Sequence, residues 1–363
     1  MSKAKRIGVC TGGGDAPGLN AVIRAIVKYG RGQLGWEVFG VEECFHGLMY
    51  PDTKSVWPLD LPSCQGLLGR GGTILGTTNR GDPFGTAEDG RCYAEIIREN
   101  YDRYALDGLI LIGGDGTQKI GHRLSTEYGI PIVGVPKTID NDLEATDFTF
   151  GFWSAVDVAT DALDRLHTTA ESHDRVMILE VMGRTAGWIA LYAGIAGGAD
   201  CIAIPEVPYD PARFIEKIER RRKIGRHFTI VVVAEGARPM DSISLEGVSG
   251  RRGAGDTLTE LLRAEFAQRD DATELRCTVL GHIQRGGSPT PFDRVLATQY
   301  GVKAVQLVES EGWGELVCLR GGEITSVPIA DVASAPREVD PQETLLGVAT
   351  SVGIELGGEI EPA

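Results

Sequence analysis

The sequence predicts an α/β protein of two doubly wound domains, with mainly parallel sheets and helices on both faces. Three observations predict this class. Short apolar, β-branched runs alternate with longer amphipathic stretches, as in repeated strand–helix units. Several runs end in glycine-rich loops that open a helix, and ligands of open α/β sheets bind at the carboxyl ends of strands. The length of 363 residues corresponds to roughly two domains.

Each element is assigned from its hydrophobic period and from the glycines or polar residues that end it. The expected strands are Ile7–Thr11, Glu37–Val41, Gly108–Ile112, Ile132–Pro136, Val176–Val181, Cys201–Ile204, Phe228–Ala234 and Cys277–Gly281. The expected helices are Gly18–Lys28, Gln118–Glu127, Ser154–His167, Ala186–Ala196, Pro211–Lys223, Thr257–Gln268 and Asp293–Glu309.

The bulk composition limits the classes of function. The net charge of −15 disfavours nucleic acid and anionic membranes as partners, so anionic substrates would need locally gathered cations. Seven cysteines, an odd number without a CxxC pair, indicate reduced thiols. No apolar run approaches the ~18 residues of a membrane helix, and the first residues do not resemble a signal peptide. A cytoplasmic location is expected.

Two glycine-rich loops are candidate phosphate sites. Thr11–Gly18 and Gly113–Thr117 each follow an apolar run and precede a helix. Glycines let backbone N–H groups approach a phosphate, and a helix N-terminus favours negative charge. Asp115, between glycines, suits a Mg²⁺ that bridges donor phosphates, because Mg²⁺ prefers oxygen ligands. Both loops are also compatible with ordinary strand-to-helix turns.

The next strand ends in Pro136–Asp142, which contains two carboxylates. In an extended backbone Thr138, Asp140 and Asp142 would face the same side. One carboxylate could then take a proton from an attacking hydroxyl. An Asx-rich turn is the alternative, but two acids near a phosphate would repel it unless they had a chemical role.

Basic residues occur singly at the predicted strand ends. Guanidinium groups bind phosphate through paired hydrogen bonds, so these positions are candidates for the cations that an acidic chain needs. They are Arg175, Arg184, Arg276, His282 and Arg285.

Taken together, these motifs resemble the bacterial 6-phosphofructokinase family. The matching segments are Gly12–Asn20, Gly114–Thr117, Thr138–Asp142, Met182–Arg184 and His282–Gly287, in order, within a resemblance from about Arg6 to about Glu309. The resemblance implies a phosphofructokinase-like fold. It also implies an ATP-binding domain of residues 1–152 plus about 284–335, and a fructose-6-phosphate-binding domain of residues 153–283 plus about 336–363. The implied reaction phosphorylates fructose 6-phosphate at O1 with ATP and Mg²⁺.

The resemblance also implies residue roles. Asp140 would be the catalytic base, and Asp115 would hold Mg²⁺. Arg175 and Arg276 would reach the sugar phosphate of a neighbouring subunit, which requires a homodimer or homotetramer. The implied ATP-binding residues are Gly14, Arg80, Gly114, Asp115, Gly116 and Thr117. The implied residues around fructose 6-phosphate are Thr138, Ile139, Asp140, Arg175, Met182, Gly183, Arg184, Glu235, Arg276, His282 and Arg285.

Two residues bear on the phosphoryl donor. Gly116 leaves room for a nucleotide where the related pyrophosphate-dependent enzymes usually carry aspartate. Lys137 is typical of those same enzymes. The combination resembles the mixed-substrate subgroup. ATP is the expected donor, because an aspartate in place of Gly116 would take up volume and add negative charge, and these are greater obstacles to a nucleotide than Lys137 is.

Three alternatives remain at this stage. One is a pyrophosphate-dependent fructose-6-phosphate 1-phosphotransferase. Another is a non-catalytic sugar-phosphate sensor, which the presence of both Asp115 and Asp140 disfavours. A third is an NAD kinase, which shares the glycine–aspartate loop but has no obvious use for Thr138–Asp142 or His282–Gly287.

Overall fold

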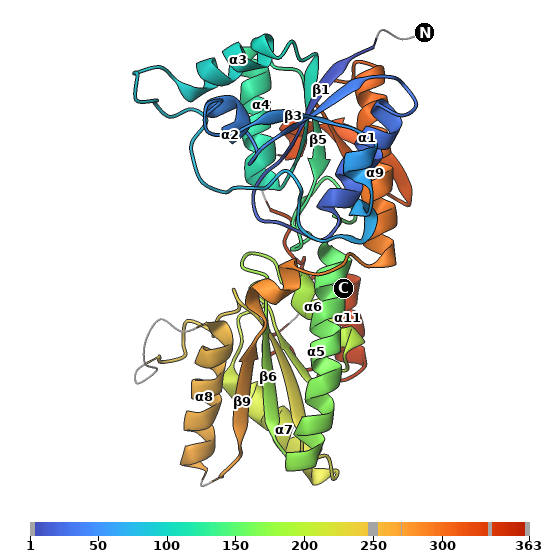
Figure 1. Cartoon of the computed structure of the whole chain (residues 1–363). Helices are drawn as coiled ribbons and strands as arrows, with labels where there is room; N and C mark the ends of the chain where they lie inside the picture. Colours follow the sequence, from blue (N-terminus) through green and yellow to red (C-terminus); the bar gives the residue numbers. More distant parts are fainter. Residues whose placement is uncertain (1–3, 246–252, 270, 333–335, 360–363) are drawn as a thin grey trace. The chain divides into compact units, whose positions relative to one another are not determined.

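The computed structural model describes residues 4–245, 253–269, 271–332 and 336–359 (Figure 1). The chain forms two compact units. Unit 1 contains residues 1–139, 143–154 and 285–336, and unit 2 contains residues 140–142, 155–284 and 337–363. The expected breaks at 152/153, 283/284 and 335/336 lie within two residues of these boundaries. The exception is the short segment 140–142, which groups with unit 2.

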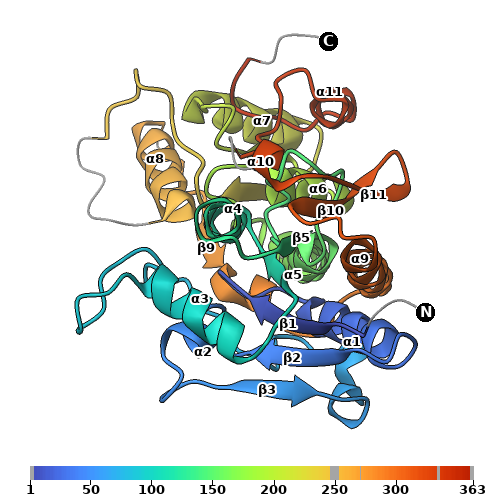
Figure 2. The same cartoon turned by 90° about the horizontal axis from the view of Figure 1, so that it is seen from above.

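Unit 1 is built on a seven-stranded sheet of order β11-β10-β5-β4-β1-β2-β3. The inner pairings are parallel, and β3 and β11 are antiparallel edges. Figure 2 shows β1, β2 and β3 as successive strands. The strands are β1 (Arg6–Thr11), β2 (Glu37–Val41), β3 (Val56–Leu59), β4 (Gly108–Gly113), β5 (Ile132–Pro136), β10 (Glu315–Arg320) and β11 (Glu323–Pro328). Its helices are α1 (Leu19–Gly30), α2 (His46–Met49), α3 (Tyr93–Arg103), α4 (Asp115–Tyr128), α9 (Pro291–Glu309) and α10 (Ile329–Val332).

Strand β4 shows why helices cover both faces of this sheet. Ile110 and Ile112 belong to a core cluster shared with residues of α1 and α9. Leu109 and Leu111 belong to a second cluster shared with residues of α2, α3 and α4. Successive side chains of a strand point to opposite faces, so an unbroken apolar strand buries both. The expected α/β class is confirmed.

Unit 2 is built on a four-stranded parallel sheet of order β7-β8-β6-β9. Its strands are β6 (Val176–Val181), β7 (Cys201–Ala203), β8 (Thr229–Ala234) and β9 (Leu275–Val279). Its helices are α5 (Phe152–His173), whose first residues fall in unit 1, α6 (Trp188–Ala196), α7 (Pro211–Lys223), α8 (Ala254–Gln268) and α11 (Thr344–Ser351).

Several expected bounds were wrong. α4 begins at Asp115 rather than Gln118, and α5 extends to His173. Strand β9 ends at Val279, where the chain enters a 3₁₀ turn, Gly281–Arg285. The strands β3, β10 and β11 and the helices α2, α3, α10 and α11 were not predicted from the sequence.

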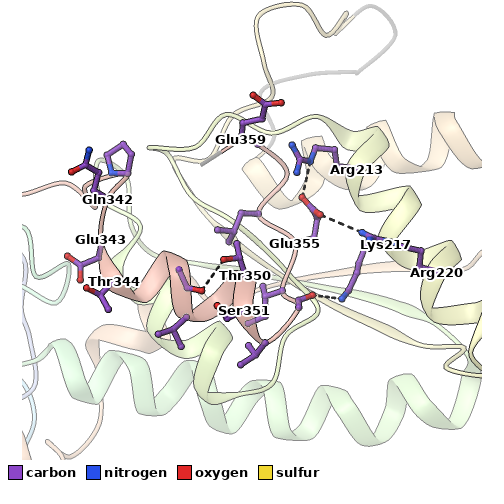
Figure 3. Close-up of a pocket in the computed structure, with 18 residues that line it drawn as sticks. Arg213, Lys217, Arg220, Gln342, Glu343, Thr344, Thr350, Ser351, Glu355 and Glu359 are labelled. Carbon is purple, nitrogen blue, oxygen red and sulfur yellow. Dashed lines mark hydrogen bonds and ion pairs between the residues drawn. The ribbon is translucent and has the colours of Figure 1, made fainter. Parts of the chain in front are cut away.

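The C-terminal segment closes the open edge of the unit 2 sheet. Glu355 pairs with Cys201 of β7 in a parallel bridge, its carbonyl accepts from Ile202 N (2.9 Å), and its side chain forms ion pairs with Arg213 (3.0 Å) and Arg220 (3.7 Å) of α7. Figure 3 shows the adjoining cavity, of about 1080 Å³, where Lys217 donates to the Gly353 carbonyl. An unpaired sheet edge invites pairing with other chains, so this segment protects β7.

Candidate active site

The first glycine-rich loop follows β1 and is held by the neighbouring strand β4 and by the loop at Thr78. Gly12 N donates to the Ile112 carbonyl, and Gly13 N donates to the Thr78 carbonyl, both at 2.9 Å. Gly13 has φ +78, a left-handed conformation that glycine adopts without strain. The loop is therefore fixed in shape by backbone contacts.

Two cations converge on this loop. Lys137 is buried, with 3% of its surface exposed, and its Nζ donates to the Gly14 carbonyl. Arg285 donates from Nη1 to the Asp15 carbonyl at 3.2 Å. A Cβ on Gly14 would lie 2.6 Å from the same Nη1, so only glycine lets the guanidinium approach so closely. The loop thus has the positive charge that a phosphate site in an acidic chain needs.

The second loop ends β4 and opens α4. Gly114 is the residue before the helix, and Thr117 packs where side chains on Gly12 or Gly113 would collide with it, at 2.7 and 2.4 Å. The buried Gln118, which sequence reasoning missed, donates from its amide to the carbonyls of Gly113 (3.1 Å) and Val135 (3.2 Å). This amide holds the ends of β4 and β5 together.

Asp115 lies in the first turn of α4 with two differently placed carboxylate oxygens. Oδ2 accepts from Lys119 Nζ at 2.8 Å. Oδ1 is buried and has no hydrogen-bond partner among the described residues. A buried carboxylate oxygen without a donor is costly unless a ligand satisfies it. This oxygen fits a hard cation such as Mg²⁺.

An apolar pocket of about 210 Å³ adjoins the two loops within unit 1. Gly116 lines it, and a Cβ there would have open space, with nothing within 4 Å. Arg80 and Thr117 line it too, so the structure brings these predicted residues together. Gly13 of the first predicted loop also lines it. The other lining residues, which no motif connects, are Cys44, Phe45, His46, Met49, Thr78, Asn79, Gly81, Pro83 and Ile120.

The segment after β5 departs from the expected extended backbone. The chain bends at Ile139 and Asp140, and Asn141 has φ +53, so residue alternation does not apply beyond Thr138. Thr138 and Asp140 are half-buried, which leaves part of each side chain accessible. Ile139 is fully buried, backbone included, so this predicted residue is not accessible to a substrate in the structure.

Unit 2 gathers a second group of predicted residues at the carboxyl edge of its sheet. Met182, Gly183 and Arg184 follow β6, and Glu235 follows β8, with its N–H donating to the Val181 carbonyl at 2.9 Å. His282 lies in the 3₁₀ turn after β9. The side chains of Arg184, Glu235 and His282 are exposed.

One buried glutamine, also missed, ties this group together. Gln284 is fully buried, and its Oε1 accepts from Met182 N at 2.7 Å. Gly183 has φ +128, and its carbonyl accepts from Gly236 N at 3.1 Å. The ends of β6, β8 and β9 are therefore held in register.

Arg175 and Arg276 lie at the amino ends of strands in the same sheet, opposite to the carboxyl ends described above. Arg175 precedes β6, and Arg276 is the second residue of β9, paired in register with Met177. Both form ion pairs with Glu274, which the Arg175 guanidinium approaches at 2.6 Å. At ~3.3 Å per residue the two ends of β6 are roughly 16 Å apart. These arginines therefore do not lie with the group that begins at Met182.

Comparison with known proteins identifies the family. The model of the phosphofructokinase family, described as "Phosphofructokinase", matches residues 6–308. The chain belongs to the phosphofructokinase family. It is 51% identical to an ATP-dependent 6-phosphofructokinase of Chloroflexus aurantiacus, over 99% of both chains.

Other phosphofructokinases show that relatives differ in donor. A pyrophosphate–fructose 6-phosphate 1-phosphotransferase of Streptomyces coelicolor is 47% identical, over 93% of this chain and 96% of its own. The solved T-state phosphofructokinase of Pichia pastoris is 33% identical with a TM-score of 0.78. It covers 97% of this chain, which spans 39% of the yeast chain.

In the part of the chain that the structure describes, no helix has the length and apolar character to cross a membrane.

Proposed function

We propose that this chain transfers the γ-phosphoryl group of ATP to O1 of fructose 6-phosphate, giving fructose 1,6-bisphosphate and ADP. The apolar pocket beside Gly116 carries the choice of ATP. A nucleoside has a flat apolar base to bury there, whereas pyrophosphate has only charged oxygens and gains nothing from Phe45, Met49 or Ile120.

Asp140 is the proposed general base. It takes the proton from the O1 hydroxyl as O1 forms its bond to the γ-phosphorus, while the bond from that phosphorus to the β–γ bridging oxygen breaks and ADP leaves. Such transfer needs positioning and charge neutralisation more than covalent chemistry. The place of Asp140 in the bend after β5 supports the role, with the residue half-buried and its Oδ1 buried.

Asp115 is the proposed ligand of Mg²⁺, with Asp142 as a second candidate. Mg²⁺, when bound, would neutralise charge on the donor phosphates. The buried Oδ1 of Asp115 supports this assignment. Gly14, Gly114 and Thr117 would surround the phosphates, with Lys137 supplying positive charge at the first loop.

Met182, Gly183, Arg184, Glu235 and His282 are the proposed residues around fructose 6-phosphate. Their common edge in unit 2 supports the assignment. Thr138 would add a contact from the segment after β5, and Arg285 would contact the sugar phosphate.

The site is proposed to need a second subunit. Arg175 and Arg276 lie at the sheet edge opposite to Arg184 and His282, so they cannot serve the same sugar phosphate within one chain. A homodimer or homotetramer could place them against a neighbour's substrate. We propose a cytoplasmic enzyme of glycolysis.

An assay of purified protein with fructose 6-phosphate, ATP and Mg²⁺ tests the proposal. We expect stoichiometric ADP and fructose 1,6-bisphosphate, with the new phosphate on C1 by ³¹P NMR. Chelation with EDTA should abolish turnover, and added Mg²⁺ should restore it. Failure to form the bisphosphate from either ATP or pyrophosphate would exclude both donor-dependent activities and favour the sugar-phosphate sensor.

Pyrophosphate is the second candidate donor. Lys137 at the first phosphate loop and the 47% identical pyrophosphate-named relative favour it. Turnover with pyrophosphate but not with ATP would replace the first proposal.

A further inference from the structure

We propose that His46 is a positioning residue for the donor nucleotide: its imidazole anchors the loop that carries Arg80 along the apolar pocket of unit 1. The inference rests on the proposed function, in which this pocket holds the nucleoside part of ATP. It goes beyond that function by naming the contact that keeps the pocket in shape.

His46 connects two walls of the pocket. It is the first residue of α2, and the opposite wall is the loop 78–83. Imidazole Nε2 lies 3.2 Å from the Arg80 carbonyl oxygen, within hydrogen-bond distance. Only a protonated Nε2 can donate to a carbonyl, so this contact selects the ring form that carries a proton there.

The ring itself is held from its other side. Nδ1 lies 3.4 Å from Glu43 Oε2, and Glu43 Oε1 accepts from Lys54 Nζ at 2.6 Å. The hydrogen bond from Lys54 lowers the pKa of Glu43, which therefore stays a carboxylate. Tyr50 meets the imidazole edge to face, with ring centroids 5.3 Å apart. These contacts fix the direction in which Nε2 points.

The loop is shaped to pass close over the imidazole. Gly81, next to Arg80, has φ +84, and a Cβ there would lie 2.8 Å from His46 Nε2. Any other side chain would meet both backbone strain and the histidine ring. Glycine at position 81 therefore allows the loop to lie against the His46 ring.

The contact from His46 fixes the backbone of Arg80, and with it the position of the Cα that bears the Arg80 side chain. Arg80 is exposed, and within the described ranges its guanidinium makes no ion pair. Its backbone is held at both ends, since its N–H donates to Thr78 Oγ1 at 3.0 Å and its carbonyl faces His46. A cation held only by its backbone is ready for an anionic ligand but depends on that backbone for its position.

Substitutions that distinguish the contribution of Nε2 from that of Nδ1 test the positioning role of His46. In His46→Gln the amide can reach the place of Nε2, whereas in His46→Asn it reaches only the place of Nδ1. His46→Leu removes both ring nitrogens. The control is His122→Leu on α4, a histidine that does not line the pocket. For each variant kcat, the KM for MgATP and the KM for fructose 6-phosphate are measured, with thermal midpoints to verify folding.

We expect His46→Leu and His46→Asn to raise the KM for MgATP about fivefold, the change that loss of one ordinary hydrogen bond produces. Turnover and the KM for fructose 6-phosphate should stay within about twofold. His46→Gln should restore the KM for MgATP, and His122→Leu should leave it unchanged.

Two outcomes overturn the inference. One is a wild-type KM for MgATP in His46→Asn, and the other is an equal rise in His46→Asn and His46→Gln, which would indicate general packing. The comparison of Gln with Asn decides the matter even if His46→Leu does not fold. A wild-type enzyme that uses pyrophosphate but not ATP would instead defeat the proposed function, and with it this role.

Discussion

Asp140 and Asp115 are carboxylates of the same type with different surroundings. Asp115 Oδ2 is paired with Lys119 while its Oδ1 is buried, which suits a cation ligand. Asp140 is half-buried in a bend after β5, which suits a group that must reach a hydroxyl. Both residues are half-buried with a buried Oδ1, so the proposed division of roles rests on their positions: Asp115 begins α4 at the second glycine-rich loop, and Asp140 lies in the bend after β5.

Replacing Asp140 tests the base. We expect Asp140→Ser to lower kcat at least ~10²-fold, because a positioned general base contributes about 10²–10⁴-fold. The KM for fructose 6-phosphate should change little, since the loss falls on the transition state. Steady-state kinetics measures both. Near-normal turnover would refute the assignment.

Replacing Gly116 tests donor selection. Gly116→Asp should impair ATP use far more than pyrophosphate use, because the carboxylate would enter the apolar pocket and repel the nucleotide. A Cβ at this position meets nothing within 4 Å, so the thermal midpoint should stay unchanged. The ratio of kcat/KM for the two donors is the readout. An equal loss with both donors would remove the steric argument.

At the scale of elements, strands buried on both faces were predictable and edge strands were not. β4 is a continuous apolar run, which the sequence shows directly. β11 is half-exposed and antiparallel, and its residues EITSVP do not form such a run. The helix α3 was missed because its buried Ile96, Ile97 and Tyr101 are scattered among charged residues.

The phosphate loops were predictable because glycine and aspartate have local reasons to occur there. The apolar pocket was not, because Phe45, Pro83 and Ile120 come from three separate segments that only the fold brings together. Gln118 and Gln284 were invisible for the same reason: their partners are backbone groups of other strands. The chain bends at Ile139–Asp140, so the expectation that Thr138, Asp140 and Asp142 face the same side of an extended strand does not apply.

Asp293 connects α9 to the first residues of α5, which fall in unit 1, and gives a test at this scale. It is fully buried, and its Oδ2 accepts from Ser154 N (2.7 Å) and Ser154 Oγ (2.6 Å), joining the start of α5 to α9. Asp293→Ala should lower the free energy of unfolding by about 3 kcal/mol, because it leaves buried donors unpaired. Asp293→Asn keeps an acceptor and should lose less. Urea unfolding measures both, and equal losses would contradict the hydrogen-bond account.

The same residue predicts a pH dependence. Burial raises the pKa of Asp293, so the folded state favours the protonated form. Above the ordinary aspartate value of about 4 the folded chain then binds more protons than the unfolded chain, and this contribution to stability falls as pH rises. Relative to Asp293→Asn, wild type should lose free energy of unfolding between about pH 4 and the raised pKa. A constant difference across that range would show that the site does not titrate.

At the scale of the whole molecule, the proposed site predicts cooperation between subunits. Arg276 and Arg184 lie at opposite ends of parallel strands, yet the proposed reaction needs both. Mixing Asp140→Ser with Arg276→Ala subunits should therefore restore activity, because a mixed pair contains one site with both residues intact. Random pairing predicts about a quarter of wild-type turnover.

Subunit exchange followed by assay measures this complementation, and light scattering reports the oligomeric state. Mixtures no more active than the sum of the two separate variants would place Arg276 outside any shared site.

The most direct measurement is the ratio of kcat/KM for MgATP to kcat/KM for magnesium pyrophosphate, with saturating fructose 6-phosphate and wild-type protein. The apolar pocket beside Gly116 predicts a ratio well above one, with fructose 1,6-bisphosphate as the product from ATP. A ratio well below one would contradict the account, because that pocket would then have no role in selecting the donor.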